Sequence, residues 1–111
     1  MKRYILACDL KNDPGLIREY IEHHKKVWPE IIESIKKSGI QNMEIFNFGN
    51  RLVMTIEAEA DFSFEEKAKI DANNDKVQEW EILMWKYQER IPSAGEGEKW
   101  VLMDKIFSLK G

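Results

Sequence analysis

The sequence has little of several features that define common protein classes. It holds a single cysteine, Cys8, among 111 residues, which excludes an intramolecular disulfide and makes a buried, inert thiol the simplest interpretation. No basic run is longer than the pairs Lys25-Lys26 and Lys36-Lys37, and the net charge is −3. This charge pattern argues against a nucleic-acid partner.

Long apolar runs are missing as well. The apolar stretch that follows Met1-Lys2-Arg3 stops at Asp9, which makes it too short for a signal-peptide core or a membrane span. Together with the lone cysteine, this absence predicts a soluble, cytoplasmic protein in a reducing setting, with no membrane partner.

The residue spacings that hold common metals and cofactors are also absent. His23 and His24 are adjacent, so a helix cannot turn both toward one ion, and there is no cysteine pair or His-x-x-x-His spacing. Gly49, Gly95 and Gly97 lack the pattern and the strand-to-helix setting of a phosphate-binding loop. We therefore expect neither a metal nor a cofactor, and cofactor-free proton transfer remains open.

The chain does have enough apolar residues for one core. With 43% hydrophobic content in 111 residues, we expect a single domain over residues 1–111. Its four Trp, five Phe and three Tyr give more apolar area than a small protomer hides comfortably, which favours a homodimer. An aromatic-rich core explains the same composition.

In the first part of the chain, the pattern predicts a strand followed by a long helix. Residues 3–10 carry apolar side chains on both faces, as a central strand does. A helix is expected to begin at Pro14, after a capping aspartate, and to run to Ser38, with Gly39 ending it. Pro29 lies inside this helix and predicts a kink.

In the rest of the chain, the pattern predicts a hairpin, two helices and a last strand. Residues 42–48 and 51–60 alternate around a Gly-Asn turn. Ser63 has the spacing of a capping box and opens a short helix, and a longer helix follows it and is closed by Pro92. Residues 99–109 are predicted to form a strand.

This order of elements is the split βαβ arrangement of ferredoxin-like α+β domains. Helices would cover one face of a four-stranded antiparallel sheet. The other face carries apolar residues on the first and last strands and polar residues on the third, so it is not simply exposed. We expect a second copy to cover this face and to enclose a cavity.

One ridge of the long predicted helix combines a titratable ring with two large aromatic rings. Tyr20, His24 and Trp28 are four residues apart and lie on the apolar side of the helix, whereas His23 is expected to face solvent. A histidine in such a place is more often a hydrogen-bonded core residue than a catalyst. The hydroxyl of Tyr20 and the helix defect at Pro29 favour a pocket wall.

This ridge can support proton transfer on a sugar. A histidine with a reference pKa of about 6.5 can exchange a proton at neutral pH, and aromatic rings can cover the C–H faces of a monosaccharide. Core packing is the simpler explanation for each of the four tryptophans. Composition and spacing lead no further than this.

The run Tyr20-x-x-x-His24-x-x-x-Trp28-Pro29-Glu30, with the strand before it and the glycine-ended helix after it, resembles the L-rhamnose mutarotase family. The similarity extends through Trp80 to the last strand. The resemblance implies a homodimeric ferredoxin-like fold, a dimeric α/β barrel, that interconverts the anomers of a 6-deoxy-L-hexose without a cofactor. By position, His24 corresponds to the proton donor, Tyr20 to a sugar-contacting tyrosine, and Trp80 to the first of two tryptophans beside the sugar. We also expect Trp28 to contact the substrate.

Two positions depart from the family pattern. Met43 stands where a second sugar-contacting tyrosine is expected, and Glu81 replaces the second tryptophan. We expect both positions to contact the substrate, and these changes to alter which sugar is preferred. Glu81 could equally be a solvated helix residue. The approach Gly97-Glu98-Lys99-Trp100 resembles sequences that handle L-fucose, which keeps L-fucose beside L-rhamnose as the substrate.

The resemblance implies a specific mechanism and leaves two alternatives. His24, protonated or acting through a water, would deliver a proton to the ring oxygen while a second group deprotonates the anomeric hydroxyl. The opened sugar would rotate and close on its other face. A non-catalytic sugar or metabolite sensor could use the same pocket, and a cofactor-free monooxygenase could use the same dimeric fold.

Overall fold

The helices and strands of the computed structural model, which describes residues 1–95 and 98–111, follow the predicted order, except that one helix is divided in two and one short strand was not predicted. They are β1 (Lys2–Leu10), α1 (Pro14–Lys25), α2 (Pro29–Lys37), β2 (Ile40–Phe48), β3 (Arg51–Ala58), α3 (Phe64–Ala72), α4 (Asp75–Trp85), β4 (Gln88–Glu89) and β5 (Val101–Leu102). Within the described ranges, none of the helices has the length and apolar content that a membrane span requires.

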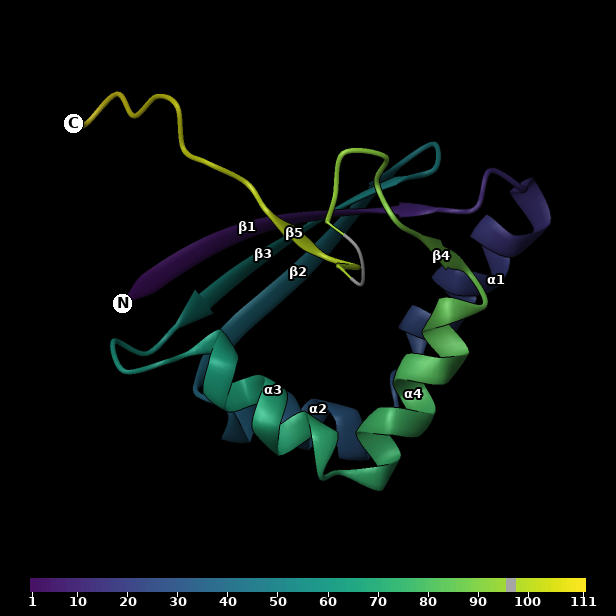
Figure 1. The fold of residues 1–111 in the computed structure, drawn as a ribbon, viewed down its shortest axis with the longest axis horizontal. Helices are drawn as coiled ribbons and strands as arrows, with labels where there is room; N and C mark the ends of the chain where they lie inside the picture. The colour runs from purple at the N-terminus through teal and green to yellow at the C-terminus, as the bar shows by residue number, and fades with distance from the viewer. Residues whose placement is uncertain (96–97) are drawn as a thin grey trace.

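The strands form one antiparallel sheet with β1 near its centre. The order is β2-β3-β1-β4, and β5 also pairs with β1, so the two short strands share one edge of β1. Figure 1 shows the helices gathered on one side of this sheet, while the C-terminal segment runs away on the other side. The expected α+β class with an antiparallel, ferredoxin-like sheet is confirmed.

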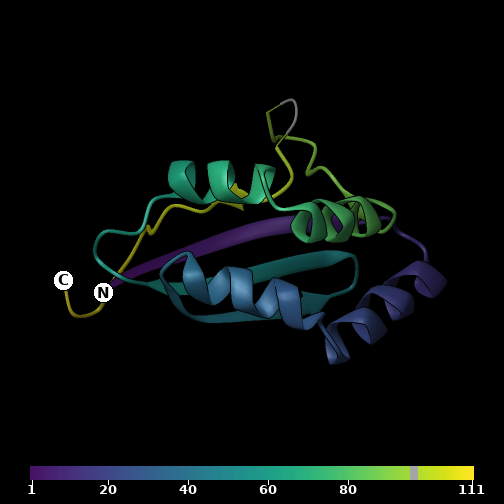
Figure 2. The same cartoon turned by 90° about the horizontal axis from the view of Figure 1, so that it is seen from below.

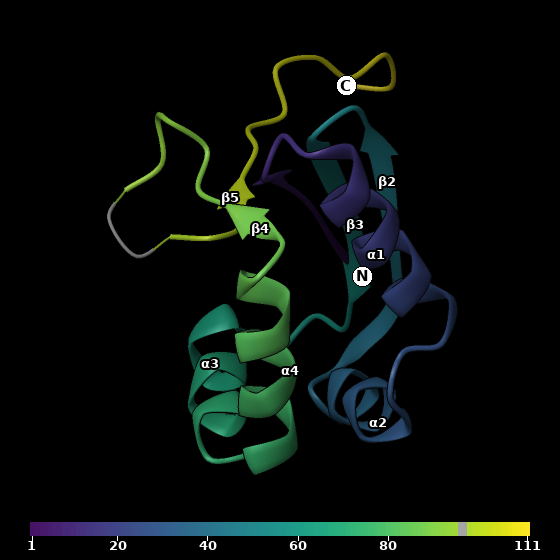
Figure 3. The same cartoon turned by 90° about the vertical axis from the view of Figure 1, so that its right-hand side faces the viewer.

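The helices form two groups beneath the sheet. Seen from below, α1 and α2 follow one another along one flank and α3 and α4 along the other (Figure 2). The view in Figure 3 shows the same separation, with α3 and α4 on the side of β4 and β5. The two groups meet where α2 contacts α4.

The prediction of one helix from Pro14 to Ser38 is wrong in its continuity. α1 ends at Lys25, and α2 begins at Pro29. Proline forces the residue before it out of the helical region, and Trp28 accordingly has φ −56° and ψ 137°. The expected kink is therefore a complete break, with Trp28 in the N-cap position of α2.

The prediction that the last helix continues to Pro92 is also wrong. α4 ends at Trp85, and the chain turns so that Gln88 pairs with Leu10 of β1. The backbone N–H of Lys11 donates to the carbonyl of Tyr87 over 2.8 Å. Sheet pairing and the burial of Tyr87 outweigh the helical periodicity of this segment.

The predicted last strand over residues 99–109 is much shorter than expected. β5 covers Val101–Leu102, and one further bond joins the N–H of Met103 to the carbonyl of Ile5 over 2.8 Å. The chain then leaves the sheet, so its apolar residues remain outside the core. Phe107 and Leu109, for example, are 75% and 90% exposed.

Two apolar clusters fill the space between the sheet and the helices. The Trp80 cluster consists of Cys8, Leu10, Tyr20, Ile31, Leu52, Val77, Trp80, Met84 and Tyr87. The Phe62 cluster consists of Leu6, Ile40, Ile56, Ala58 and Phe62. The predicted inward face of β3 contributes to both clusters, through Leu52 to the first and through Ile56 and Ala58 to the second.

Candidate active site

A cavity of about 680 Å³ lies between the helices and the sheet, alongside both apolar clusters. Small-molecule sites typically enclose about 300–1,000 Å³, so the volume suits a monosaccharide. Its walls include five of the six site residues expected from the sequence: Tyr20, His24, Met43, Trp80 and Glu81. They come from α1, β2 and α4, which the fold brings together.

His24 lies in this wall with one ring nitrogen already engaged. Its Nδ1 is 2.9 Å from the carbonyl oxygen of Tyr20, one turn earlier on α1. Because a carbonyl only accepts, Nδ1 carries the proton in the neutral ring, and Nε2 is left as the acceptor. The ring lies 4.3 Å from the ring of Tyr20 and meets Trp80 edge-on at 5.6 Å, both measured between centroids.

The surroundings of His24 favour the neutral imidazole. Burial lowers its pKa from the usual value of 6.5, the bond to the Tyr20 carbonyl acts in the opposite direction, and neighbouring His23 lowers it further. At pH 7 the ring therefore carries a free acceptor nitrogen. This is the protonation state of a general base.

Tyr20 supplies a buried hydroxyl beside this imidazole. Its side chain is 2% exposed, and its hydroxyl accepts a hydrogen bond from Nε2 of Gln88 over 3.4 Å. Burial raises the pKa of Tyr20 well above 10, so the phenol stays protonated. Tyr20 can orient a ligand by a hydrogen bond, but it is a poor base.

The two tryptophans expected at the site have different positions. Trp80 is buried and lines the cavity. Trp28 does not line it, and instead packs edge-on against Trp80, with centroids 5.1 Å apart and ring planes at 71°. The amino group of Lys76 lies 5.8 Å from the centre of the Trp28 ring. Trp28 therefore holds the cavity-lining ring of Trp80 from behind.

The two positions that depart from the family pattern both reach the cavity. Met43 pairs with Ile56 across the sheet, which turns its side chain toward the helices. Glu81 forms an ion pair with Lys99, whose side chain is 11% exposed and whose amino group lies 5.1 Å from the centre of the Trp85 ring. A nearly buried ammonium requires such compensation.

The prediction that His23 faces solvent is wrong. It is half-buried, and its Nε2 lies 3.1 Å from the hydroxyl of Tyr87. That hydroxyl donates to Glu19 over 3.1 Å, so the imidazole of His23 is the donor to Tyr87. The turn after α4 places Tyr87 against α1.

Two polar residues of the cavity wall, Gln88 and Lys99, were missed as site residues. Gln88 was not singled out among the polar residues near the end of the predicted helix, and its pairing with Leu10 of β1 places it in the cavity wall. Lys99 was noticed only within the fucose-like segment. Gly97 of that segment lies outside the described residues, whereas Lys99 and Trp100 both line the cavity.

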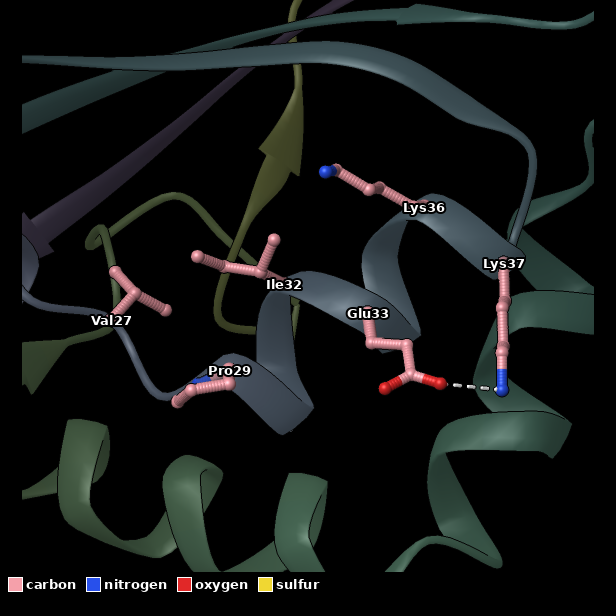
Figure 4. Close-up of a pocket in the computed structure, with 6 residues that line it drawn as sticks. All are labelled: Val27, Pro29, Ile32, Glu33, Lys36 and Lys37. Carbon is pink, nitrogen blue, oxygen red and sulfur yellow. Dashed lines mark ion pairs between the residues drawn. The ribbon is translucent and has the colours of Figure 1, made fainter.

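A second, more open hollow adjoins the cavity on the side of α2. Figure 4 shows the six residues that line it, Val27, Pro29, Ile32, Glu33, Lys36 and Lys37, with the carboxylate of Glu33 directed at the ammonium of Lys37. These two groups are 2.7 Å apart and largely exposed. A hollow with this lining offers no buried group that could transfer a proton.

Together, the fold and the cavity define a ferredoxin-like α+β domain built around a histidine-lined site for a small molecule. Comparison with known proteins agrees with this class. The family model for L-rhamnose mutarotase matches residues 3–109. The chain belongs to the L-rhamnose mutarotase family, which places it among the sugar mutarotases, a class of isomerases.

Individual relatives support this membership. An L-fucose mutarotase of Xanthomonas campestris is 40% identical over 111 residues, covering 98% of this chain and 89% of the relative. An L-rhamnose mutarotase of Burkholderia ambifaria is 26% identical over 92 residues, 81% of each chain. The solved L-rhamnose mutarotase of Formosa agariphila shares the fold with a TM-score of 0.72 at 21% identity, covering 98% of this chain and 99% of that one.

Proposed function

We propose that the protein interconverts the α and β anomers of a 6-deoxy-L-hexose, with L-fucose as the first candidate substrate and L-rhamnose as the second. The observation that carries this proposal is the neutral His24 in the cavity wall, with Nδ1 bonded to a carbonyl and Nε2 available. The higher identity to the L-fucose mutarotase than to the L-rhamnose mutarotase of B. ambifaria supports the order of the candidates.

The mechanism begins with His24 as the base. Its Nε2 accepts the proton of the anomeric hydroxyl while the bond between the anomeric carbon and the ring oxygen breaks. The ring oxygen takes a proton from a water molecule, which is left as hydroxide, and an open-chain aldehyde results. Proton transfer by a positioned side chain contributes about 10²- to 10⁴-fold to the rate of such a step.

Ring closure reverses these proton movements on the other face of the carbonyl. Rotation about the bond next to the aldehyde exposes that face to the sugar's hydroxyl. As the hydroxyl adds, it loses its proton to the hydroxide, which becomes water again, and the imidazolium of His24 returns its proton to the carbonyl oxygen. The opposite anomer is formed, and His24 is neutral again, so no cofactor is consumed.

The remaining cavity residues bind and orient the sugar. The hydroxyl of Tyr20 donates to the sugar, and the ring of Trp80 covers an apolar sugar face, with Trp28 supporting it. Met43 and the Glu81–Lys99 pair line the cavity and determine which arrangement of sugar hydroxyls fits there. Of the two members of the pair, Glu81 supplies the hydrogen-bond acceptor.

Anomer-exchange NMR tests this function. The wild-type protein is expected to accelerate exchange between the anomeric signals of L-fucose, to do so less for L-rhamnose, and to have little effect on D-glucose. No acceleration with either deoxy sugar would overturn the proposal. Sugar-induced thermal stabilisation without faster exchange would instead support a sensor that binds and does not convert its ligand.

The homodimer implied by the family remains part of the proposal. Phe46, Val53 and Ala7 occupy paired positions on neighbouring strands and lie on the face of the sheet opposite the helices. Phe46 is 55% exposed in the single chain. A second copy would bury this apolar face.

Light scattering coupled to size-exclusion chromatography tests the dimer. The wild type is expected at twice the mass of the chain, and Phe46→Glu at the mass of one chain because the substitution places a charge in the interface. Ile82→Glu, on an exposed position of α4, is the matched control and should leave the mass unchanged. A monomeric wild type would contradict the dimer.

We also propose a reducing, cytoplasmic setting, with which the chemistry of Cys8 is compatible. The residue is a free cysteine and fully buried in the Trp80 cluster. Burial raises its pKa to about 12, which keeps the thiol protonated and unreactive.

A further inference from the structure

The amide of Gln88 is buried in the cavity wall with one end unused. The residue is 3% exposed, and its Nε2 donates to the hydroxyl of Tyr20 over 3.4 Å. Its Oε1 is buried and has no hydrogen-bond partner among the described residues. The side chain lines the same cavity as His24 and Trp80.

An unpaired buried amide oxygen is unfavourable in the free protein. Leaving such an acceptor without a donor costs about 1–3 kcal/mol, and most buried polar groups are paired for this reason. A methionine would fill a similar volume without that penalty. The free amide end is therefore better explained by a ligand than by packing.

Asp71 provides an instructive contrast in the same cavity. Its Oδ1 is also unpaired, but its other oxygen is bonded to Lys67, and its side chain is 19% exposed. The ammonium of Lys67 compensates that carboxylate through its other oxygen. Gln88 has no ion pair of this kind, and it lines the cavity, so a ligand there is the source of the donor that we consider for its oxygen.

The position of Gln88 connects it to the proposed chemistry. Tyr20 lies between Gln88 and His24, because its hydroxyl accepts from the amide while its ring packs against the imidazole. If the anomeric hydroxyl of a sugar lies at His24, a neighbouring ring hydroxyl of that sugar can approach the side chain of Gln88. Such a hydroxyl is a donor and matches the free amide oxygen.

We propose that Gln88 is a specificity-determining residue whose amide oxygen accepts a hydrogen bond from one ring hydroxyl of the sugar. The proposal rests on the proposed function and deepens it, because it names a substrate contact that the family motif does not include. Gln88 of β4, and not the motif of Tyr20, His24 and Trp28, then selects among sugars that differ in the configuration of that hydroxyl.

The test compares Gln88→Met with the wild type on L-fucose and on its 2-deoxy, 3-deoxy and 4-deoxy derivatives. For L-fucose, Gln88→Met is expected to lower kcat/KM about 5- to 100-fold, since the loss corresponds to one hydrogen bond with a buried acceptor. One of the three deoxy sugars should show a change of less than about twofold, because it lacks the hydroxyl that Gln88 binds.

A purely structural role would give different results. Gln78→Met, on the exposed side of α4, is the matched control and should leave exchange unchanged. Gln88→Met should melt at or above the wild-type temperature, since it removes an unpaired buried group. A clearly lower melting temperature, an equal loss with all four sugars, or no loss with L-fucose would each overturn the proposal.

Binding measurements separate this proposal from the proposed function. If the wild type binds L-fucose but does not accelerate anomer exchange, the mutarotase proposal fails. The contact of Gln88 is then tested by sugar-induced thermal stabilisation. Stabilisation by L-fucose should be lost in Gln88→Met. Stabilisation by one of the deoxy sugars should be the same in Gln88→Met as in the wild type. A wild type that binds none of these sugars overturns both proposals.

Discussion

The Trp80 and Phe62 clusters are neighbours in one core but differ in the polar groups they hold. The five members of the Phe62 cluster are apolar, and Phe62 packs edge-on against Phe64 with centroids 5.0 Å apart. The Trp80 cluster includes the hydroxyl of Tyr20 and adjoins the half-buried imidazole of His24 and the buried amide of Gln88.

This difference separates a region that stabilises the fold from one that performs chemistry. Burying hydroxyl, imidazole and amide groups is unfavourable unless each is paired, and Gln88 shows that the pairing is incomplete. Proteins retain such local disadvantages mainly where function needs them. Changes in the Trp80 cluster should therefore affect catalysis, and changes in the Phe62 cluster stability.

The largest expected effect is the loss of exchange on replacing His24. His24→Gln removes the group that takes up the proton, and exchange of L-fucose anomers should fall about 10²- to 10⁴-fold toward the uncatalysed rate. Saturation-transfer NMR measures this directly, and circular dichroism should show an intact fold. A rate within threefold of the wild type would remove His24 from the mechanism.

Phe62→Ala should have the opposite profile. Truncating a buried phenylalanine leaves a cavity and typically lowers the free energy of unfolding by about 3–5 kcal/mol. Urea denaturation measures the loss, and Phe62→Leu, which retains more volume, should lose less. Exchange per folded molecule is expected to stay within twofold of the wild type. A selective loss of exchange would show that the two clusters are not functionally distinct.

A smaller effect is expected at the wall formed by Glu81. Glu81→Trp restores the aromatic residue of the family pattern, and the ratio of kcat/KM for L-rhamnose over L-fucose should rise about tenfold, as expected for one altered pocket contact. Glu79→Trp, at an exposed position of α4, is the control and should leave the ratio unchanged. An unaltered ratio with Glu81→Trp would exclude this position from sugar selection.

The smallest expected effect is a pH dependence of kcat/KM and of the unfolding free energy that comes from His24, beside the Trp80 cluster. Since the pKa of His24 is lowered below 6.5, kcat/KM should be constant near pH 7 and fall as the pH drops through that lowered pKa. The free energy of unfolding should also fall below about pH 6.5, because the unfolded chain binds the proton more readily than the folded one.

Comparison with His24→Gln isolates this contribution. The difference in unfolding free energy between the two proteins should change with pH between about 6.5 and the lowered pKa of His24, and should be constant above pH 6.5. Phe62→Leu should retain the wild-type pH dependence. If the unfolding free energy of His24→Gln fell at acid pH as it does in the wild type, the titration would belong to another group.

Local signals in the sequence were sufficient for most helix starts. Asp13 accepts bonds from the backbone N–H groups of Gly15 and Leu16, and Ser63 accepts one from Glu66, as predicted from their spacing. The break before Pro29 was underestimated, although it also follows from a local rule, because the residue before a proline is excluded from the helical region.

The segment after Trp85 could not be predicted in the same way. The apolar positions Met84 and Tyr87 fit a helical face, and both are buried as that pattern predicts. Pairing with β1 nevertheless ends the helix and forms β4. The choice between the two depends on a strand about 80 positions earlier in the chain, and local periodicity carries no information about that partner.

By itself, the sequence determined the order of the elements other than β4, the inward face of β3 and the ridge that carries Tyr20 and His24, because each depends on side-chain spacing within one segment. Only the tertiary structure decided that Trp28 lies behind Trp80, that Lys99 pairs with Glu81 and that Gln88 faces the cavity. These contacts join segments far apart in the chain, and burial and pairing between segments arise only when the whole core is assembled.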